Sequence, residues 1–290
     1  MALAIITLAY MLDPQLAINC QGRLLSLERP VAMGILNLTP DSFFDGGRYT
    51  SLDAVLAHVG QLLEEGAAII DVGGMSTRPG AAFVSESAEL ERVVPAIEAI
   101  HARFPEALLS IDTVRARVAR ESVAAGASII NDISAGRMDE GFYETVASLN
   151  VPYVLMHMQG TPETMQQEPV YENVVLEVLD FLIAEVGKLR ALGLKDIVVD
   201  PGFGFGKTVT HNYQLLKNLH VLQCLDCPVL VGLSRKSMVN RALGIKAADA
   251  LNGTTALHMV ALQQGAKILR VHDVRPAVET IKLWEQLENA

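Results

Sequence analysis

The chain has 290 residues, of which 50% are hydrophobic but only 5% aromatic. This length fits a single eight-stranded α/β barrel, and the composition predicts a core of Val, Ile, Leu and Ala rather than stacked rings. A formal net charge of −10 and a pI near 5.2 argue against nucleic acid as a partner, because a phosphate backbone is held by clustered Lys and Arg. An anionic ligand would instead need a few placed cations, for which Arg78, Lys236 and Arg270 are candidates.

The apolar segment Ala2–Leu12 is interpreted as packing rather than as a targeting signal. No Lys or Arg precedes it, and it is shorter than the roughly 20 residues that span a bilayer. No other stretch is apolar enough to cross a membrane, so we expect a soluble protein. Three cysteines do not make a disulfide framework, which indicates a reducing compartment such as the cytoplasm. Cys224 and Cys227 have C-x-x-C spacing but precede a predicted strand, so we expect inert thiols.

Short apolar runs recur along the chain, each followed by a cluster of Gly, Asn, Asp or Ser and then by a longer segment with helical periodicity. This order is typical of parallel βα units, and the near-continuous hydrophobicity of the runs indicates strands buried on both faces. The predicted strands are Val31–Asn37, Ala68–Val72, Leu108–Asp112, Ser128–Asp132, Pro152–Met156, Ile197–Asp200, Val229–Leu233 and Lys267–Val271. The sequence therefore predicts a single α/β domain over residues 1–290, a (β/α)8 TIM barrel.

Glycines mark the turns of this predicted barrel. Gly66, Gly126 and Gly265 each stand shortly before a strand, which predicts helix caps with a structural role. The segment Asn19–Gly22 lies between two apolar stretches and predicts a short N-terminal hairpin that closes the bottom of the barrel. The competing fold is a doubly wound open sheet. Its glycine-rich phosphate motif is missing after the first strand, where Asn37–Phe43 reads Asn-Leu-Thr-Pro-Asp-Ser-Phe, so the barrel is preferred.

Polar residues close the predicted strands, and in a barrel the carboxyl ends of all strands open into one shared mouth. Asn37 offers an amide oxygen to a hard cation such as Mg²⁺, although a turn-forming role is equally consistent with its position. Asp71–Gly80 places Arg78 among turn formers, which favours an anion-binding loop over a plain surface charge. Asp71 itself is interpreted as structural support for a neighbouring loop.

Asp112 and Asn131 follow buried strands directly. We predict that both hydrogen-bond a ligand, and that each needs a partner because an unpaired buried polar group is costly. His157 follows the fifth strand, where packing and pocket lining are equally good interpretations.

The segment Asp200–Lys207, with the sequence Asp-Pro-Gly-Phe-Gly-Phe-Gly-Lys, is the densest signal in the chain. The carboxylate of Asp200 can accept two parallel hydrogen bonds from an N–C–N edge, such as that of an aminopyrimidinone ring. The glycines let the backbone approach a flat ligand, and they favour Phe203 and Phe205 as exposed rings that contact it rather than as core residues.

Two further polar segments end the seventh and eighth strands. Ser234–Ser237 leads into a helix, and Arg270 and His272 follow each other at the period of two that places side chains on one strand face. Barrels most often hold phosphate at these two strand ends, so both side chains are predicted to face the same anion.

Together these motifs closely resemble the dihydropteroate synthase family, in order and at every predicted strand end from Gly34 to Asp273. The matching segments are Gly34–Phe43, Ser76–Gly80, Ile111–Thr113, Ile130–Asp132, Leu155–Gly160, Asp200–Lys207, Ser234–Ser237 and Arg270–Asp273. The family condenses 6-hydroxymethyl-7,8-dihydropterin diphosphate with 4-aminobenzoate, which releases diphosphate and gives 7,8-dihydropteroate for folate synthesis.

The resemblance implies a role for each strand-end residue. The implied catalytic residues are Asp112, Lys236 and Arg78. Pterin diphosphate would be bound by Thr77, Asp112, Asn131, Asp200, Lys236, Arg270 and His272. The 4-aminobenzoate would lie among Phe43, Pro79, Phe205, Lys236 and Ser237, with its carboxylate near the helix start at Ser237. Asn37 would bind Mg²⁺ on the diphosphate, and a homodimer is implied.

The resemblance implies that catalysis depends mainly on stabilising the charges that develop during the reaction. Diphosphate leaves before the amine attacks, and the ring-binding residues stabilise the resulting pterin cation. Mg²⁺ and the cationic side chains stabilise the departing anion, while Asp112 faces the developing positive centre. One residue departs from the pattern, because Met75 stands where many relatives carry a carboxylate or an amide.

Three alternatives stay open beside this interpretation. A pterin-binding homologue without synthase activity is disfavoured by the retained segments Ser76–Pro79 and Ser234–Ser237. A folate-dependent methyltransferase on a similar barrel would not need the diphosphate side formed by Arg270 and His272. A metal-dependent hydrolase is disfavoured because the first strand lacks the H-x-H pair that such barrels usually carry.

Overall fold

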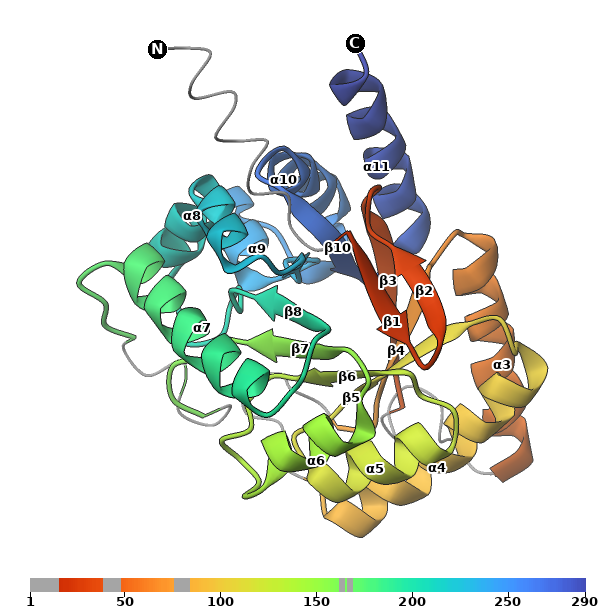
Figure 1. Cartoon of the computed structure of the whole chain (residues 1–290). Helices are drawn as coiled ribbons and strands as arrows, with labels where there is room; N and C mark the ends of the chain where they lie inside the picture. Colours follow the sequence, from red (N-terminus) through yellow and green to blue (C-terminus); the bar gives the residue numbers. More distant parts are fainter. Residues whose placement is uncertain (1–15, 39–47, 76–83, 162–164, 166–168) are drawn as a thin grey trace.

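The computed structural model of the chain describes residues 16–38, 48–75, 84–161, 165 and 169–290. Within these ranges eight parallel strands close into a barrel in the order β10-β3-β4-β5-β6-β7-β8-β9. They are β3 Val31–Asn37, β4 Ile69–Gly73, β5 Leu108–Asp112, β6 Ile129–Asp132, β7 Tyr153–Met156, β8 Ile197–Asp200, β9 Val229–Val231 and β10 Ala266–Val271. This arrangement confirms the predicted (β/α)8 fold (Figure 1). The predicted strands differ only at their ends, as in β9, which stops at Val231 rather than at Leu233.

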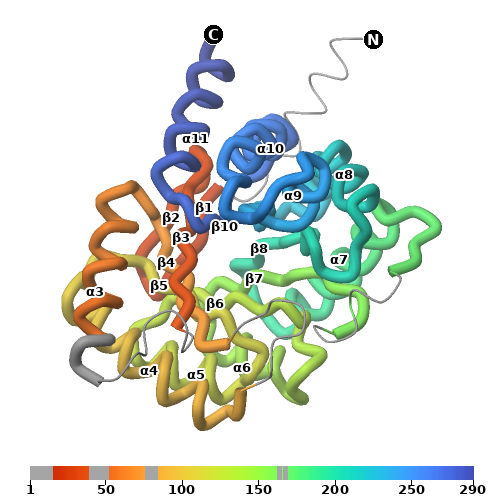
Figure 2. Tube along the Cα trace, turned by 180° about the vertical axis from the view of Figure 1, so that it is seen from behind, coloured from red at the N-terminus to blue at the C-terminus, as the bar shows by residue number. Residues whose placement is uncertain are grey.

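Helices alternate with the strands along the chain and surround the barrel (Figure 2). They are α3 Arg48–Glu64, α4 Glu86–Arg103, α5 Ala116–Ala124, α6 Phe142–Leu149, α7 Val174–Ala191, α8 Val209–Lys217, α9 Ser237–Leu243, α10 Leu251–Gln263 and α11 Val274–Glu288, with short 3-10 helices at Leu219–Leu225 and Ala247–Asp249. Local chemistry starts several of them. The side chain of Asn173, for example, accepts hydrogen bonds from the first amides of α7 and so satisfies donors that lack a partner within the helix. The glycines predicted as helix caps, Gly66, Gly126 and Gly265, have positive φ angles, which confirms that prediction.

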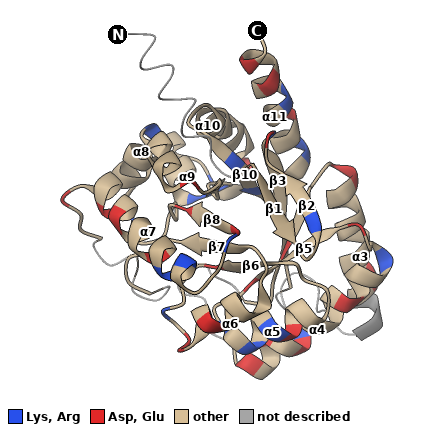
Figure 3. Cartoon of the chain, viewed as in Figure 1, with Lys and Arg blue, Asp and Glu red and all other residues tan. Residues whose placement is uncertain are grey.

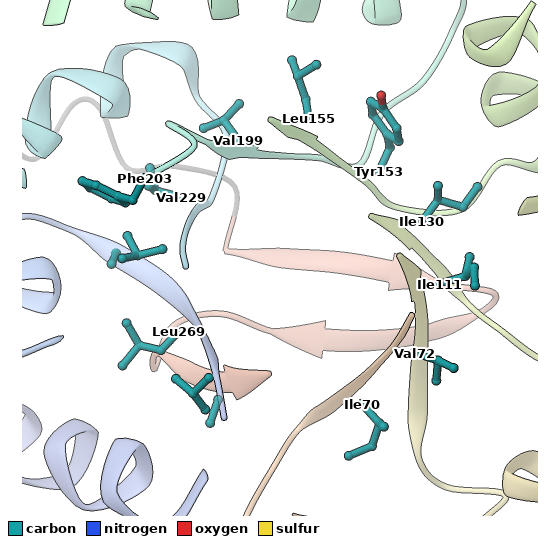
Figure 4. Packing of buried hydrophobic residues seen from close by; sticks show 14 of the residues in the cluster. Ile70, Val72, Ile111, Ile130, Tyr153, Leu155, Val199, Phe203, Val229 and Leu269 are labelled. Carbon is teal, nitrogen blue, oxygen red and sulfur yellow. The ribbon is translucent and has the colours of Figure 1, made fainter. Parts of the chain in front are cut away.

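Side chains of the strands alternate between the helix-covered outside and the interior of the barrel. Ile70, Val72 and Ile111 point outward and pack in the large cluster between strands and helices (Figure 4). The interior begins with an apolar layer to which each strand contributes one residue, namely Met33, Ile69, Leu108, Ile129, Val154, Val198, Leu230 and Ile268. Two residues further along four of these strands stand Asp71, Asn131, Asp200 and Arg270. A polar layer therefore lies directly above the apolar one, toward the carboxyl ends of the strands.

A hairpin precedes the barrel and closes its amino-terminal end (Figure 1). Its strands β1, Ala17–Cys20, and β2, Arg23–Ser26, are joined by Gln21 and Gly22, both with positive φ, as a tight two-residue hairpin turn requires. Ile18, Cys20 and Leu27 are buried in the apolar layer of the barrel interior. The predicted hairpin and its position are thus confirmed.

Other expectations about surface and thiols can also be compared with the structure. In Figure 3 acidic and basic residues are interspersed along the outer helices in this view. Across the described ranges, no helix is both long and apolar enough for a bilayer span. The segment Ala2–Leu12 lies outside the described residues. Cys227 is buried, which raises the pKa of its thiol to about 11, as expected for an inert cysteine.

Candidate active site

Four strand-end residues meet inside the barrel through the guanidinium group of Arg270. Its Nε donates to Asp71 Oδ2 at 2.6 Å, and its Nη2 donates to Asp112 Oδ2 at 2.7 Å. The side-chain amide of Asn131 donates to the same oxygen of Asp71 at 3.0 Å. These residues belong to β4, β5, β6 and β10, and the bonds between non-adjacent strands show that the side chains point into the barrel interior. The partners that Asp112 and Asn131 were predicted to need are therefore present.

The protonation of Asp112 is balanced by its surroundings. Burial raises the pKa of its carboxyl to about 7, while the positive charge of Arg270 lowers it and the nearby Asp71 raises it further. The Arg270 guanidinium remains charged, because the attraction of Asp71 and Asp112 outweighs the cost of its burial and raises its pKa. Asp112 therefore binds a proton more readily than a solvent-exposed aspartate does.

Asp200, at the end of β8, and Lys236, which caps the start of α9 after β9, form a second group of charges. The Cβ position of Gly232 would lie 3.8 Å both from Asp200 Oδ2 and from Lys236 Nζ, so the two side chains converge above this glycine. Burial raises the pKa of Asp200, and the charge of Lys236 opposes that shift. Burial also lowers the pKa of Lys236 to about 8, with Asp200 acting in the other direction.

The glycine-rich segment after Asp200 turns back over this pair. Asp200 Oδ1 accepts a hydrogen bond from the amide of Gly202 at 2.7 Å, and Lys236 Nζ donates to the carbonyl of Phe203 at 2.6 Å. The Lys236 ammonium also lies 4.6 Å from the ring centre of Phe205. The expectation that both phenylalanine rings are exposed is wrong for Phe203, which is fully buried in the core, whereas Phe205 is partly exposed. Positive φ angles on both sides of Phe203 turn its side chain the other way.

Asn37 ends β3 beside the carboxylate of Asp112. The Cβ position of Gly73 would lie 3.8 Å from Asn37 Oδ1 and 3.8 Å from Asp112 Oδ2, which places these oxygens in one neighbourhood at the mouth. Within the described residues the Asn37 amide makes no side-chain hydrogen bond, and no cluster of three His, Cys, Asp or Glu residues could hold a metal ion. One neutral oxygen at the mouth fits a hard cation whose other ligands come from a substrate.

The ends of β9 and β10 are joined by two neighbouring side-chain contacts. Ser234 Oγ lies 3.1 Å from His272 Nδ1, and Arg235 binds both oxygens of Asp273 at 2.7 and 2.8 Å. Desolvation of the ring and, second, the charge of Arg270 lower the pKa of His272 to about 4, although the residue as a whole is exposed. His272 is thus a neutral hydrogen-bonding group at pH 7 rather than a cation.

An apolar wall borders the mouth on the side of β4 to β7. It is formed by the buried residues Met75, Val114, Ile133, Met156, Met158 and Met165, with Val84 and Phe205 packed against them. Met75, the residue that departs from the expected pattern, is 6% exposed. Its thioether therefore contributes to an apolar surface where a carboxylate would need a polar partner.

Comparison with known proteins agrees with this geometry. Residues 33–272 match the family of pterin-binding enzymes. The dihydropteroate synthase of Haemophilus influenzae is 48% identical over 271 residues, which cover 93% of this chain and 98% of that protein. The chain belongs to the dihydropteroate synthase family.

Solved structures of the family have the same fold. A Yersinia pestis dihydropteroate synthase in complex with a sulfonamide drug superposes with a TM-score of 0.89 at 45% identity, covering 94% of this chain and 100% of that one. The Xanthomonas albilineans dihydropteroate synthase with 4-aminobenzoic acid has a TM-score of 0.88 at 44% identity, covering 95% and 99%. The same enzyme has been solved with 7,8-dihydropteroate, with a TM-score of 0.85, 42% identity and coverage of 94% and 99%.

The described part of the chain brings together most of the residues that the dihydropteroate synthase resemblance singled out. Asp112, Asn131 and Arg270 share one network, and Asp200, Lys236 and Phe205 share another. Ser237 is the first residue of α9, as predicted, and is exposed. Phe43, Thr77, Arg78 and Pro79 lie outside the described residues, so their predicted roles remain predictions.

The structure decides the roles of two interior residues whose interpretation from sequence was wrong or left open. The interpretation of Asp71 as loop support is wrong, because its fully buried carboxylate holds Arg270 and Asn131. A signal was available, since Asp71 follows Ile69 at the same period of two at which Asn131 follows Ile129. For His157 the packing alternative holds, because its ring is buried and its Nδ1 lies 2.9 Å from the Nζ of the equally buried Lys207.

A buried acidic residue behind the mouth was also missed. Glu89 on α4 is fully buried, accepts a hydrogen bond from Thr113 Oγ1 at 2.7 Å and pairs with Arg115. Arg115 in turn donates to the carbonyl of Val84 at 2.5 Å, and Arg92 donates to that of Gly74 at 2.9 Å. Arg92 and Arg115, from α4 and the start of α5, thus hold Gly74 and Val84. These two residues flank the segment that carries Thr77, Arg78 and Pro79.

Proposed function

We propose that this protein is a dihydropteroate synthase that condenses (7,8-dihydropterin-6-yl)methyl diphosphate with 4-aminobenzoate. The products are 7,8-dihydropteroate, for folate biosynthesis, and diphosphate. The observation that carries the proposal is the pair of strand-end networks inside one barrel mouth, the first around Arg270 with Asp112 and Asn131, the second around Asp200 with Lys236.

The pterin ring fits between these two networks. Asp200 is 5% exposed and directs Oδ2 toward the site, while Asn131 and Asp112 line the facing strands. A buried carboxylate suits the N–C–N edge of an aminopyrimidinone, because two parallel hydrogen bonds offset its loss of hydration. Lys236 supplies a positive charge that opposes the rise in the pKa of Asp200 caused by burial, and it can donate to a ring acceptor.

The reaction begins with cleavage of the bond between the pterin methylene carbon and the diphosphate oxygen, and the electron pair leaves with diphosphate. Asp112, whose carboxylate lies at the mouth, stabilises the positive charge that develops on the pterin. The amine of 4-aminobenzoate then forms the new C–N bond and loses a proton. No strong protein base is required, because the neutral aromatic amine is the nucleophile.

The diphosphate side is formed by Arg270, His272 and Asn37. Arg270 uses Nε and Nη2 for the two carboxylates, and its Nη1 makes no hydrogen bond to another described residue, so this nitrogen is available to an anion. Asn37 is the residue we assign to Mg²⁺, which when bound would neutralise charge on the leaving diphosphate. His272 contributes as a neutral hydrogen-bonding group.

The 4-aminobenzoate site is assigned to Phe205, Lys236 and Ser237, together with Phe43 and Pro79. In support, the Xanthomonas relative has been solved with 4-aminobenzoic acid. The partly exposed Phe205 ring packs beside the apolar wall, which suits an aromatic substrate.

We further propose that the enzyme acts as a homodimer in the cytoplasm. Leu283 and Leu287, one turn apart on α11, are 65% and 55% exposed, which supports an apolar contact between copies. Free cysteines are consistent with a reducing compartment. Light scattering of the wild type and of Leu283→Lys would test the dimer.

The proposed activity is tested by incubating purified protein with the pterin diphosphate, Mg²⁺ and 4-aminobenzoate, and by following dihydropteroate chromatographically. Asp200→Asn is expected to reduce kcat/KM by a factor on the order of a hundred or more, because it removes a charged acceptor for the pterin. Asp180→Asn on the exposed face of α7 serves as the matched control. Absence of dihydropteroate with the wild type would overturn the proposal.

A further inference from the structure

Two lysines hold the glycine-rich segment Gly202–Lys207, and only one of them belongs to the site described above. Lys236 Nζ donates to the carbonyl of Phe203, and Lys207 Nζ donates to the carbonyl of Phe205 at 3.0 Å. Lys207 is 4% exposed. A lysine so deeply buried is rare unless its ammonium group is fully partnered.

The ammonium group of Lys207 has three acceptors for its three hydrogens. Besides the Phe205 carbonyl, these are His157 Nδ1 at 2.9 Å and the His157 carbonyl at 3.4 Å. When Lys207 is protonated its ammonium group can only donate, so His157 Nδ1 accepts and the neutral ring carries its proton on Nε2, in agreement with a pKa that burial lowers to about 2. Burial also lowers the pKa of Lys207 to about 7, and the charge of Asp200 opposes that shift. Lys207 thus joins the end of β7 to the segment that follows β8.

The segment fits closely against the chain after β7. A Cβ on Gly202 would lie 1.9 Å from the His157 carbonyl oxygen, and one on Gly206 would lie 2.4 Å from that of Gln159. Asn212 accepts from the amide of Gly204 at 2.7 Å, and Tyr171 donates to the carbonyl of Gly206 at 2.8 Å. Gly202, Gly204 and Gly206 are therefore each held by close packing or by a hydrogen bond. The carbonyl of Phe205, between them, is held by Lys207.

We propose that Lys207 is a positioning residue that fixes the backbone of Phe205, and with it the Phe205 ring beside Lys236, as one wall of the 4-aminobenzoate site. This inference rests on the proposed function. Lys207 itself is buried behind the segment and touches neither substrate. Its loss should weaken the second substrate more than the pterin, because the stronger electrostatic support of Asp200 comes from Lys236 rather than from Lys207.

The test compares steady-state kinetics and direct pterin binding of Lys207→Met with those of the wild type. The KM for 4-aminobenzoate is expected to rise by about tenfold, as for loss of a charge-assisted hydrogen bond, while kcat and the Kd of a pterin analogue change by less than about threefold. Lys217→Met, at an exposed position of the following helix, is the matched control and should match the wild type.

A second variant keeps the inference testable if Lys207→Met does not fold. Tyr171→Phe removes only the hydroxyl that holds the Gly206 carbonyl, and it should raise the same KM by about threefold with the pterin Kd unchanged. Unchanged aminobenzoate KM in either variant, or equal weakening of both substrates, overturns the inference. Failure of the wild type to form dihydropteroate would instead overturn the proposed function, so the two failures are distinct.

Discussion

Arg270 donates from Nη2 to Asp112 Oδ2 across 2.7 Å, so one ion pair joins the residues that we propose for the diphosphate side and for the pterin side of the mouth. Anything that changes the charge of Asp112 therefore also changes the surroundings of Arg270. The link bears directly on how the enzyme should respond to pH.

The kcat/KM for pterin diphosphate is expected to follow a narrow bell with apparent pKa values of about 7 and about 8. Burial raises the pKa of Asp112 to about 7, so below that pH the carboxyl is neutral and activity falls. Burial lowers the pKa of Lys236 to about 8, so above that pH the ammonium is lost and activity falls again. Both values belong to a network of charges rather than to isolated groups. Rate measurements across this range check the profile.

Lys236→Arg should move only the alkaline limb of that profile to higher pH, because a guanidinium keeps its proton throughout the range. Binding of a pterin analogue without diphosphate serves as the control, since the ligand's own phosphate titration is then removed. A profile that stays flat between about pH 6 and about pH 9 would contradict the assignment.

Asp71→Asn is expected to lower the free energy of unfolding by about 3 to 5 kcal/mol, the usual cost of breaking a buried ion pair on one side. Asp71 is fully buried and accepts from both Arg270 and Asn131, so its charge is compensated only inside the barrel. Urea unfolding measures the change, with Asp53→Asn on the exposed face of α3 as the control. A loss below about 1 kcal/mol would show that water or relaxation replaces the pair.

Glu89→Gln should reduce kcat/KM by about tenfold while the Kd of a pterin analogue stays near its wild-type value. Without the Glu89 carboxylate, Arg115 loses its ion-pair partner and holds the carbonyl of Val84 less firmly. Glu98→Gln, exposed on the same helix, is the control. If binding of the pterin analogue weakened equally, Glu89 would support the pterin-binding residues rather than the neighbouring loop.

Gly202→Ala should be far more destabilising than Gly193→Ala, although both glycines have positive φ. At Gly193 a Cβ meets no atom within 4 Å, so only backbone strain of about 1 to 2 kcal/mol is expected. At Gly202 the Cβ would lie 1.9 Å from a carbonyl oxygen, so overpacking brings the loss to about 3 kcal/mol or more. Similar unfolding midpoints for the two variants would show that the segment moves freely aside.

The sequence was sufficient to predict the strands and to identify the polar residues at their ends. Strands buried on both faces are continuous apolar runs, and each run stops where the chain reaches the polar mouth, as at Asp112, Asn131 and Asp200. In a closed barrel the carboxyl ends of all strands open into the same mouth. The polar residues at these ends could therefore be assigned to one site without knowing which distant residues are in contact.

The pairing of these residues could not be predicted in the same way. Arg270 and Asp71 are 199 positions apart, and their contact depends on the closure of β10 on β3. The opposite directions of Phe203 and Phe205 depend on backbone angles at the intervening glycines, which a repeated Gly-Phe pattern does not reveal. Lys207 and Glu89 were missed because the sequence does not distinguish a buried charged residue from an exposed one.

The hairpin that closes the barrel imposes an order on how the chain can fold. The hairpin precedes every barrel strand in the chain, yet Ile18 and Leu27 dock on a layer that includes Leu230 and Ile268, and this layer is complete only once β10 has paired with β3. A nascent chain that lacks its last strand therefore offers the hairpin an incomplete layer, which leaves apolar side chains exposed to water and to other chains. The contacts of the hairpin with β9 and β10 close very long loops, so we expect the amino-terminal end of the barrel to be among the last parts of the chain to form.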